Sequence, residues 1–204
     1  MKMDFEGRLG LLHNPLISPG FTSYKILMKV IRDFPCRIEE IKHVWIPMTD
    51  GCRLSARIWL PEDSQQNPVP AILEYIPYRK NDGTALRDSL IHPYFAGHGY
   101  AAVRVDLRGS GDSEGILEGE YLQQELEDGI EVLEWISKQS WCDGNLGMMG
   151  KSWGGFNSLQ VAALQPKPLK AIITVCSTDD RYSDDVHYMG GCVLATDMLG
   201  WAST

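Results

Sequence analysis

The chain has 204 residues, of which 44% are hydrophobic and 23% are charged, and its formal net charge is −8. This length and composition are typical of one globular domain with a sizeable core, and the acidic balance argues against nucleic acid or an anionic membrane as a partner. No apolar run approaches the roughly 20 residues that a membrane span needs, and the first residues lack the pattern of a secretion signal.

Cysteine usage points to a reducing compartment. The number of cysteines is odd and none are in C-x-x-C spacing, so neither a disulfide framework nor a zinc site is expected. The sequence therefore predicts a cytoplasmic protein without a metal ion or cofactor, in which five thiols are free: Cys36, Cys52, Cys142, Cys176 and Cys192.

Residues 1–33 show no sustained periodicity, and Pro15 and Pro19 interrupt them. We expect a poorly patterned extension there, followed by a domain over residues 34–204. That domain begins with two short segments, 42–47 and 53–60, which flank a turn. Hydrophobic and polar residues alternate in the second segment, which predicts a half-buried antiparallel hairpin.

Beyond the hairpin, apolar strand-like runs alternate with helical patterns. The most regular pattern predicts a helix over 121–139, because its apolar residues recur at helical spacing. Alternation of this kind predicts an α/β fold with a mostly parallel sheet. The apolar face of that helix consists of Leu122, Leu126, Ile130, Leu133 and Ile136. The other expected elements are strands at 71–76, 99–107, 146–149 and 169–176, and helices at 85–96 and 156–163.

The segment Gly150-Lys151-Ser152-Trp153-Gly154 allows two interpretations. A phosphate-binding P-loop needs a glycine at position 145, where Asn145 stands, and a polar loop in place of the apolar run 146–149. The G-x-S-x-G spacing fits a nucleophile elbow, a sharp strand-to-helix turn that presents a serine. We therefore prefer the elbow to the P-loop, and an ordinary glycine-rich turn remains the simpler alternative.

Five stretches together resemble a hydrolase family that includes bacterial cocaine esterase, α-amino-acid ester hydrolases and X-prolyl dipeptidyl peptidases. They follow the family's order over about residues 34–204: IPMTDGCRLSARIWLPE, EYIPYRKND, VRVDLRGSGDSEG, WCDGNLGMMGKSWGG and KAIITVCSTDD. The resemblance implies the N-terminal part of an α/β-hydrolase fold. It would comprise a mostly parallel sheet with an antiparallel hairpin at its start, truncated at the beginning of the helical cap.

The resemblance also implies roles for three residues. Ser152 would be the nucleophile, and the backbone N–H of Trp153, where the family commonly has tyrosine, would donate to the oxyanion. The second donor would be the Tyr78 hydroxyl, although the residues alone indicate equally an aromatic packed on the edge of the sheet. The implied partner is a small-molecule ester, amide or peptide substrate, and a homo-oligomer is left open.

Two further clusters have simpler explanations. Asp106 and Arg108 follow a predicted strand, and we expect them to pair with each other in a glycine-rich turn. The alternative interpretation places Arg108 near the substrate. The run Asp179, Asp180, Asp184, Asp185 and His187 could suggest a metal site, but a solvated acidic loop is the preferred explanation.

An α/β-hydrolase triad follows the order Ser, acid, His, and the histidine that follows Ser152 is His187, too early in the expected fold. We therefore expect the chain to be an N-terminal fragment of a serine hydrolase, without its triad acid and histidine and inactive alone. The alternative is a catalytically inactive interaction or regulatory fragment that keeps the elbow as a scaffold.

Overall fold

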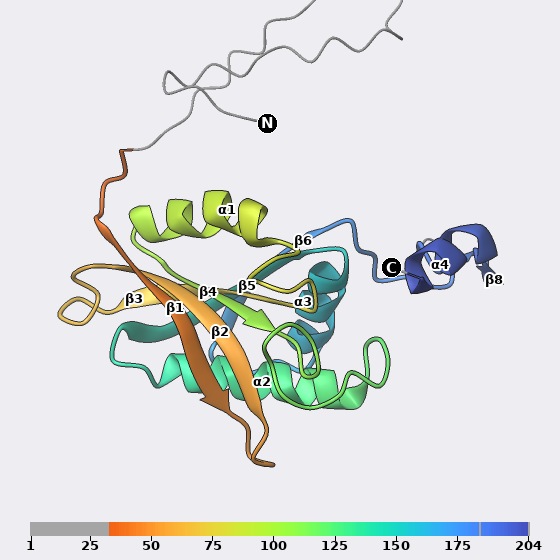
Figure 1. Ribbon diagram of the computed structural model, residues 1–204, viewed down its shortest axis with the longest axis horizontal. Helices are drawn as coiled ribbons and strands as arrows, with labels where there is room; N and C mark the ends of the chain where they lie inside the picture. Colours follow the sequence, from red (N-terminus) through yellow and green to blue (C-terminus); the bar gives the residue numbers. More distant parts are fainter. Residues whose placement is uncertain (1–32, 184, 204) are drawn as a thin grey trace, which may run out of the picture. The chain divides into compact units, whose positions relative to one another are not determined.

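The structure, a computed structural model, describes residues 33–183 and 185–203 (Figure 1). The predicted N-terminal extension thus lies outside the described residues, apart from Asp33. The main strands are β1 (Ile38–Pro47), β2 (Arg53–Pro61), β3 (Val69–Ile76), β4 (Ala101–Asp106), β5 (Cys142–Lys151) and β6 (Leu169–Val175). The helices are α1 (Ala85–Gly97), α2 (Gln123–Ser137), α3 (Trp153–Ala163) and α4 (Ala195–Ala202). A small hairpin joins β7 (Tyr188–Met189) to β8 (Cys192–Val193).

One six-stranded sheet has the order β1-β2-β4-β3-β5-β6. β1 and β2 form the predicted antiparallel hairpin, and β2 is also antiparallel to β4. The pairs β3–β4, β3–β5 and β5–β6 are parallel. This arrangement confirms the predicted α/β fold with a mostly parallel sheet and an antiparallel start.

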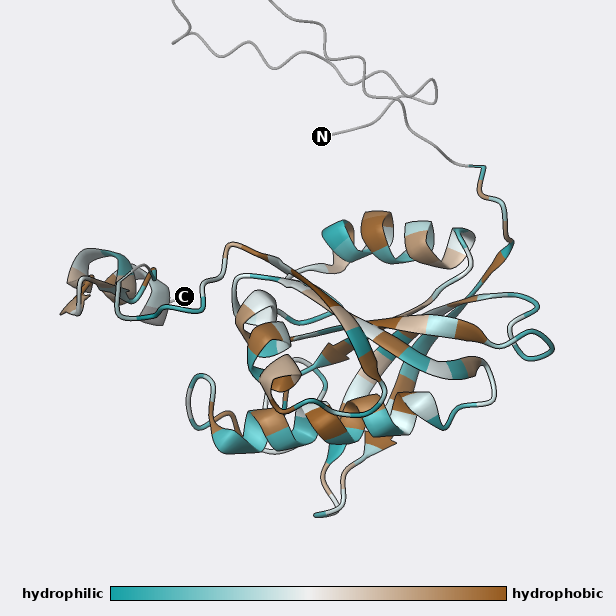
Figure 2. Ribbon diagram, turned by 180° about the vertical axis from the view of Figure 1, so that it is seen from behind, coloured by the Kyte–Doolittle hydropathy of each residue, from teal (hydrophilic) through white to brown (hydrophobic). Residues whose placement is uncertain are grey.

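Helices cover both faces of the sheet. In Figure 1, α1 lies on one face and α2 and α3 lie on the other. Hydrophilic and hydrophobic residues alternate around α2, the long helix at the bottom of Figure 2, and its Leu133 and Ile136 are buried. The helix is shorter than predicted, so that Leu122 stands at its N-cap and is 42% exposed.

The prediction that β2 is only half-buried is wrong. Leu54 and Ile58 point into the main core as expected, but Ser55 and Trp59 on the opposite face are also buried. Trp59 packs under α1, where its ring stacks on His92 with 4.9 Å between centroids. Both faces of β2 are buried because of its place in the sheet, beside β4 and under α1, which the local sequence pattern does not encode.

The segment after β6 continues into the β7–β8 hairpin and α4. The prediction that this segment begins a helical cap remains a prediction. None of the helices in the described part of the chain is both long and apolar enough to cross a lipid bilayer.

Candidate active site

The turn between β5 and α3 has the geometry of a nucleophile elbow. Ser152 joins the strand to the helix with φ 58° and ψ −119°. A positive φ is energetically unfavourable for any residue other than glycine. The backbone N–H of Ser152 donates to the carbonyl of Val175 on β6 at 2.8 Å. The surrounding strands therefore hold Ser152 in a conformation that an isolated turn would avoid.

Glycines allow the strand and the helix to approach closely at this turn. A Cβ on Gly150 would collide with the backbone of Gly154. A Cβ on Gly154 would lie 2.5 Å from Cγ2 of Ile76, which belongs to β3. The spacing of these two glycines around Ser152 thus has a steric cause, as the elbow interpretation requires.

Ser152 and Tyr78 line the same cavity, which has a volume of about 460 Å³. Tyr78 comes from the loop between β3 and α1 and is half-buried. Its ring meets Trp201 of α4 edge-on, with 6.1 Å between ring centroids and an interplanar angle of 88°. Tyr121 and His187 also line this cavity. The structure thus brings two of the three predicted site residues into one cavity.

Trp153, the third predicted residue, begins α3 and is buried. As the first residue of a helix, its backbone N–H has no carbonyl one turn earlier within that helix. Its indole Nε1–H donates to Oε1 of Glu125 at 2.6 Å, and Oε2 of Glu125 accepts the backbone N–H of Tyr121 at 2.9 Å. Burial raises the pKa of Glu125, although these hydrogen bonds oppose the shift.

The sequence did not predict that Glu125 bonds the side chain of Trp153; Glu125 itself does not line the cavity of Ser152. The available signal was the tryptophan at a position where the resembled family commonly has tyrosine. The indole Nε1–H of Trp153 donates to the buried Glu125 carboxylate, and this pairing becomes visible only once α2 and α3 are placed.

His187 lines the cavity, but each of its ring nitrogens is within hydrogen-bond distance of a carboxylate. Nδ1 is 2.8 Å from Oδ1 of Asp185, and Nε2 is 2.8 Å from Oε2 of Glu120. Among the described residues, no hydrogen bond joins His187 to the Ser152 hydroxyl. The histidine therefore ties the segment after β6 to the loop before α2.

The acidic run before His187 is only partly the solvated loop that was predicted. Asp179 and Asp180 are exposed, whereas Asp185 is buried against His187. Asp184 lies outside the described residues.

The predicted pairing of Asp106 with Arg108 is wrong. Arg108 turns toward α2, where it pairs with Asp128 at 2.7 Å, and it also bonds Asp50 of the β1–β2 turn at 2.8 Å. Asp106 points to the other face and pairs with Lys80 and Arg104. The two side chains diverge because β4 ends at Asp106, so Arg108 lies in the following turn and no longer follows the alternation of the strand.

Arg108 also does not line the cavity of Ser152. It lines a separate cavity of about 400 Å³ next to α2. The placement does not support the alternative interpretation in which Arg108 lies near the substrate.

Three buried side chains outside the elbow have donor atoms close enough together to hold a cation: Glu74, Asp88 and His92. Two guanidinium groups already engage these carboxylates. Arg87 lies 2.7 Å from each carboxylate, and Arg104 lies 3.2 Å from Asp88. A bound cation would have to displace these arginines, so the cluster fits a structural ion-pair network better than a metal centre.

Comparison with known proteins connects this geometry to a family. A family model described as X-Pro dipeptidyl-peptidase (S15 family) matches residues 50–204. Cocaine esterase from Rhodococcus sp. (strain MB1 Bresler) is 35% identical over 164 residues, which cover 79% of this chain and 28% of that protein. The chain therefore spans less than a third of the length of this curated relative.

Solved structures give the same result. A CocE/NonD family hydrolase from Staphylococcus aureus has a TM-score of 0.57 and 30% identity, and the match covers 65% of this chain and 26% of that one. An α-amino-acid ester hydrolase has a TM-score of 0.59 and 25% identity, covering 87% of this chain and 31% of that one. The match to these structures confirms the predicted resemblance and the hydrolase-like fold.

Proposed function

Since the chain belongs to the X-Pro dipeptidyl-peptidase (S15) family, we propose that it carries the nucleophile of a serine hydrolase that cleaves ester or amide bonds. Ser152 is the proposed nucleophile, and the Tyr78 hydroxyl and the Trp153 backbone N–H are the proposed oxyanion donors. The observation that carries the proposal is the strained Ser152 on its strand-to-helix turn, in one cavity with Tyr78.

The proposed chemistry proceeds through an acyl-enzyme. Ser152 Oγ attacks the carbonyl carbon of the substrate while a base accepts the hydroxyl proton. The carbonyl oxygen becomes an oxyanion, to which the Trp153 N–H and the Tyr78 O–H donate. Collapse of this intermediate expels the alcohol or amine with a proton from the base, and water then hydrolyses the acyl-enzyme.

The base is the part of this scheme that the described residues do not supply. Both ring nitrogens of His187 already face carboxylates, which argues against His187 as the partner of Ser152. We infer that the triad acid and histidine come from sequence outside these 204 residues, in keeping with the small share of cocaine esterase that the chain spans. Residues 34–204 would then be an incomplete hydrolase domain.

The substrate proposal is limited to a class. The relatives' names include an esterase, an amino-acid ester hydrolase and dipeptidyl-peptidases. We propose a small acyl ester, or an amide such as an X-Pro dipeptidyl bond, because a cavity of about 460 Å³ accommodates a ligand of that size. A cytoplasmic setting is proposed with it, because the odd number of cysteines and their spacing favour free thiols.

A fluorophosphonate probe tests the proposal because it reacts with an activated serine and leaves ordinary serines unlabelled. We expect the whole protein to be labelled at Ser152 and the Ser152→Ala variant to remain unlabelled. The 204-residue chain alone should label near the background rate, since it lacks the proposed base. Absence of labelling at Ser152 in the whole protein would favour an inactive scaffold instead.

A further inference from the structure

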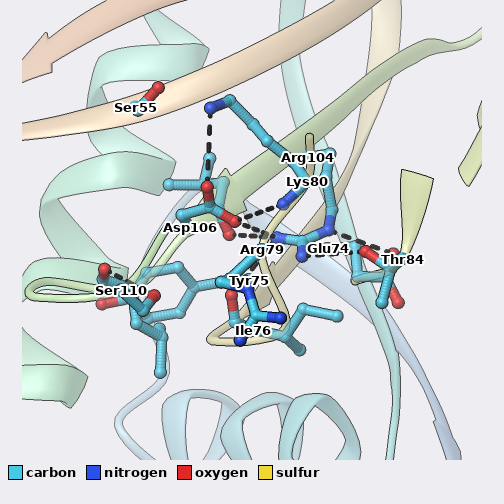
Figure 3. Close-up of polar contacts among 12 residues, drawn as sticks. Ser55, Glu74, Tyr75, Ile76, Arg79, Lys80, Thr84, Arg104, Asp106 and Ser110 are labelled. Atoms are coloured by element: carbon cyan, nitrogen blue, oxygen red, sulfur yellow. Dashed lines mark hydrogen bonds and ion pairs between the residues drawn. The ribbon is translucent and has the colours of Figure 1, made fainter. Parts of the chain in front are cut away.

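Lys80 is a buried lysine two residues after Tyr78, in the loop that joins β3 to α1. We propose that Lys80 is a positioning residue, which holds the Tyr78 hydroxyl where the oxyanion forms. This inference rests on the proposed function of Tyr78. It assigns a role to the ion pairs of Asp106 with Lys80 and Arg104, which are drawn in Figure 3 and take no part in the chemistry proposed above.

Both ends of Lys80 are anchored to acidic residues. Its backbone N–H donates to Oδ1 of Asp106 at 2.9 Å, and its Nζ lies 3.4 Å from Oδ2 of the same carboxylate. Nζ also donates to Oδ2 of Asp112 at 2.6 Å. The side chain of Lys80 is 0% exposed, so this ammonium depends on these contacts to replace its hydration.

Asp106 joins three segments of the chain at the end of β4 (Figure 3). Besides Lys80, it pairs with Arg104 at 3.3 Å and accepts the backbone N–H of Asp112 at 3.3 Å. A Cβ on Gly111 would collide with this carboxylate. Asp106 is therefore fixed from several sides, and a loop anchored to it takes up a defined position.

The loop that carries Tyr78 needs such an anchor. Arg79, between Tyr78 and Lys80, has φ 53°, which is unfavourable for a residue with a side chain. The loop also folds back so tightly that a Cβ on Gly83 would collide with the carbonyl oxygen of Tyr78. Strain of this kind persists only where the surroundings over-determine the conformation. Lys80 is next to Arg79, and both its backbone N–H and its side chain bond Asp106 of β4.

Placement of the hydroxyl is what this anchor would secure. An oxyanion donor acts only within about 2.7–3.1 Å of the developing charge, and a displacement of about 1 Å can cost roughly 100-fold in rate. The Tyr78 ring is half-buried and touches Trp201 edge-on, so its orientation also depends on the backbone that carries it.

The first test replaces Lys80 by methionine in the whole protein. Methionine has similar length, but removing one partner of a buried ion pair is destabilising, so the melting temperature of the variant is measured first to establish that it folds. Hydrogen exchange should accelerate at least about tenfold in peptides covering 77–84, while β3 and β4 stay protected. Lys138→Met, the same substitution at an exposed lysine, is the matched control and should leave this exchange unchanged. Unchanged exchange in Lys80→Met would overturn the inference whether or not the protein is active.

Kinetics then separate positioning from simple stability. Lys80→Met should lower kcat by roughly 10- to 100-fold with little change in KM. In a Tyr78→Phe background the same substitution should have almost no further effect on kcat, because the group it positions is already gone. Equal losses in both backgrounds would show that Lys80 acts independently of Tyr78 and would refute the inference.

Two further variants keep these outcomes distinct. If Lys80→Met does not fold, Asp112→Asn weakens the Nζ anchor at a partner whose side chain is 43% exposed, and it should shift exchange and kcat in the same direction by less. Ser152→Ala tests the proposed function separately. Turnover that survives Ser152→Ala contradicts that function, whereas turnover that depends on Ser152 but ignores Lys80 contradicts only the positioning role.

Discussion

Tyr78→Phe is the most discriminating change at the candidate site, because it removes one hydroxyl and keeps the ring. The edge-on contact with Trp201 at 6.1 Å involves the ring alone and survives the substitution. Tyr78 is half-buried, so neither core packing nor the melting temperature should change appreciably. The substitution is therefore expected to weaken stabilisation of the transition state and leave the stability of the fold unchanged.

Loss of one oxyanion donor typically costs about 10²–10³ in kcat, or about 2.7–4 kcal/mol. KM should change much less, because the oxyanion exists only in the transition state and the intermediate. The assay is the pre-steady-state release of p-nitrophenol from a p-nitrophenyl ester by a form of the protein whose turnover depends on Ser152. Both the burst rate and the steady-state rate are recorded.

Tyr94→Phe serves as the matched control, since Tyr94 is an exposed tyrosine on α1, which covers the opposite face of the sheet from α3. It should leave kcat and KM unchanged. Two results would refute the reasoning: a Tyr78→Phe enzyme with full kcat, or one whose loss appears entirely in KM. Either would return Tyr78 to the role of a packing aromatic.

Three other outcomes are expected. Gly150→Ala should lower stability by about 1–3 kcal/mol in urea unfolding and reduce probe labelling, because the added Cβ collides with the facing helix. Glu125 has a raised pKa in the folded state, so its ionisation opposes folding as pH rises from the unfolded value of about 4.5. In Glu125→Gln the amide oxygen can still accept from Trp153, but the bond from the Tyr121 N–H is lost at every pH. The melting temperature of the variant relative to the parent should therefore rise as the pH goes from 4 to 7; a difference that does not change with pH would contradict the shift. A thiol reagent under denaturing, non-reducing conditions should titrate five cysteines, and three or fewer would contradict the free-thiol prediction. In the native protein the exposed Cys176 should react before the buried Cys142, because burial raises the pKa of the Cys142 thiol.

The elements that the sequence predicted well are those with local causes. The hairpin followed from alternation around a tight turn, and the strand-to-helix turn at Ser152 followed from two glycines at fixed distances from it. The structure adds why the glycines are needed: the helix backbone and Ile76 leave no room for a Cβ.

The errors concern contacts that tertiary placement decides. Asp106 was assigned to Arg108, two residues away, but its partner Lys80 lies 26 residues earlier in the chain. Trp59 lies in the segment predicted to be half-buried, and its burial comes from packing against His92 of α1. A sequence pattern records which residues are charged or apolar, but it does not record which of two faces a later helix will cover.

β6 is the last strand in the described sheet order, with β5 as its neighbour there. Its Ile173 and Val175 are 59% and 48% exposed, so an apolar strip runs beside open backbone hydrogen-bonding groups. Exposed strands of this kind are templates for edge-to-edge association between copies. For the 204 residues on their own, we therefore expect self-association through this strand at high concentration, and a charged side chain substituted at Ile173 or Val175 should reduce it.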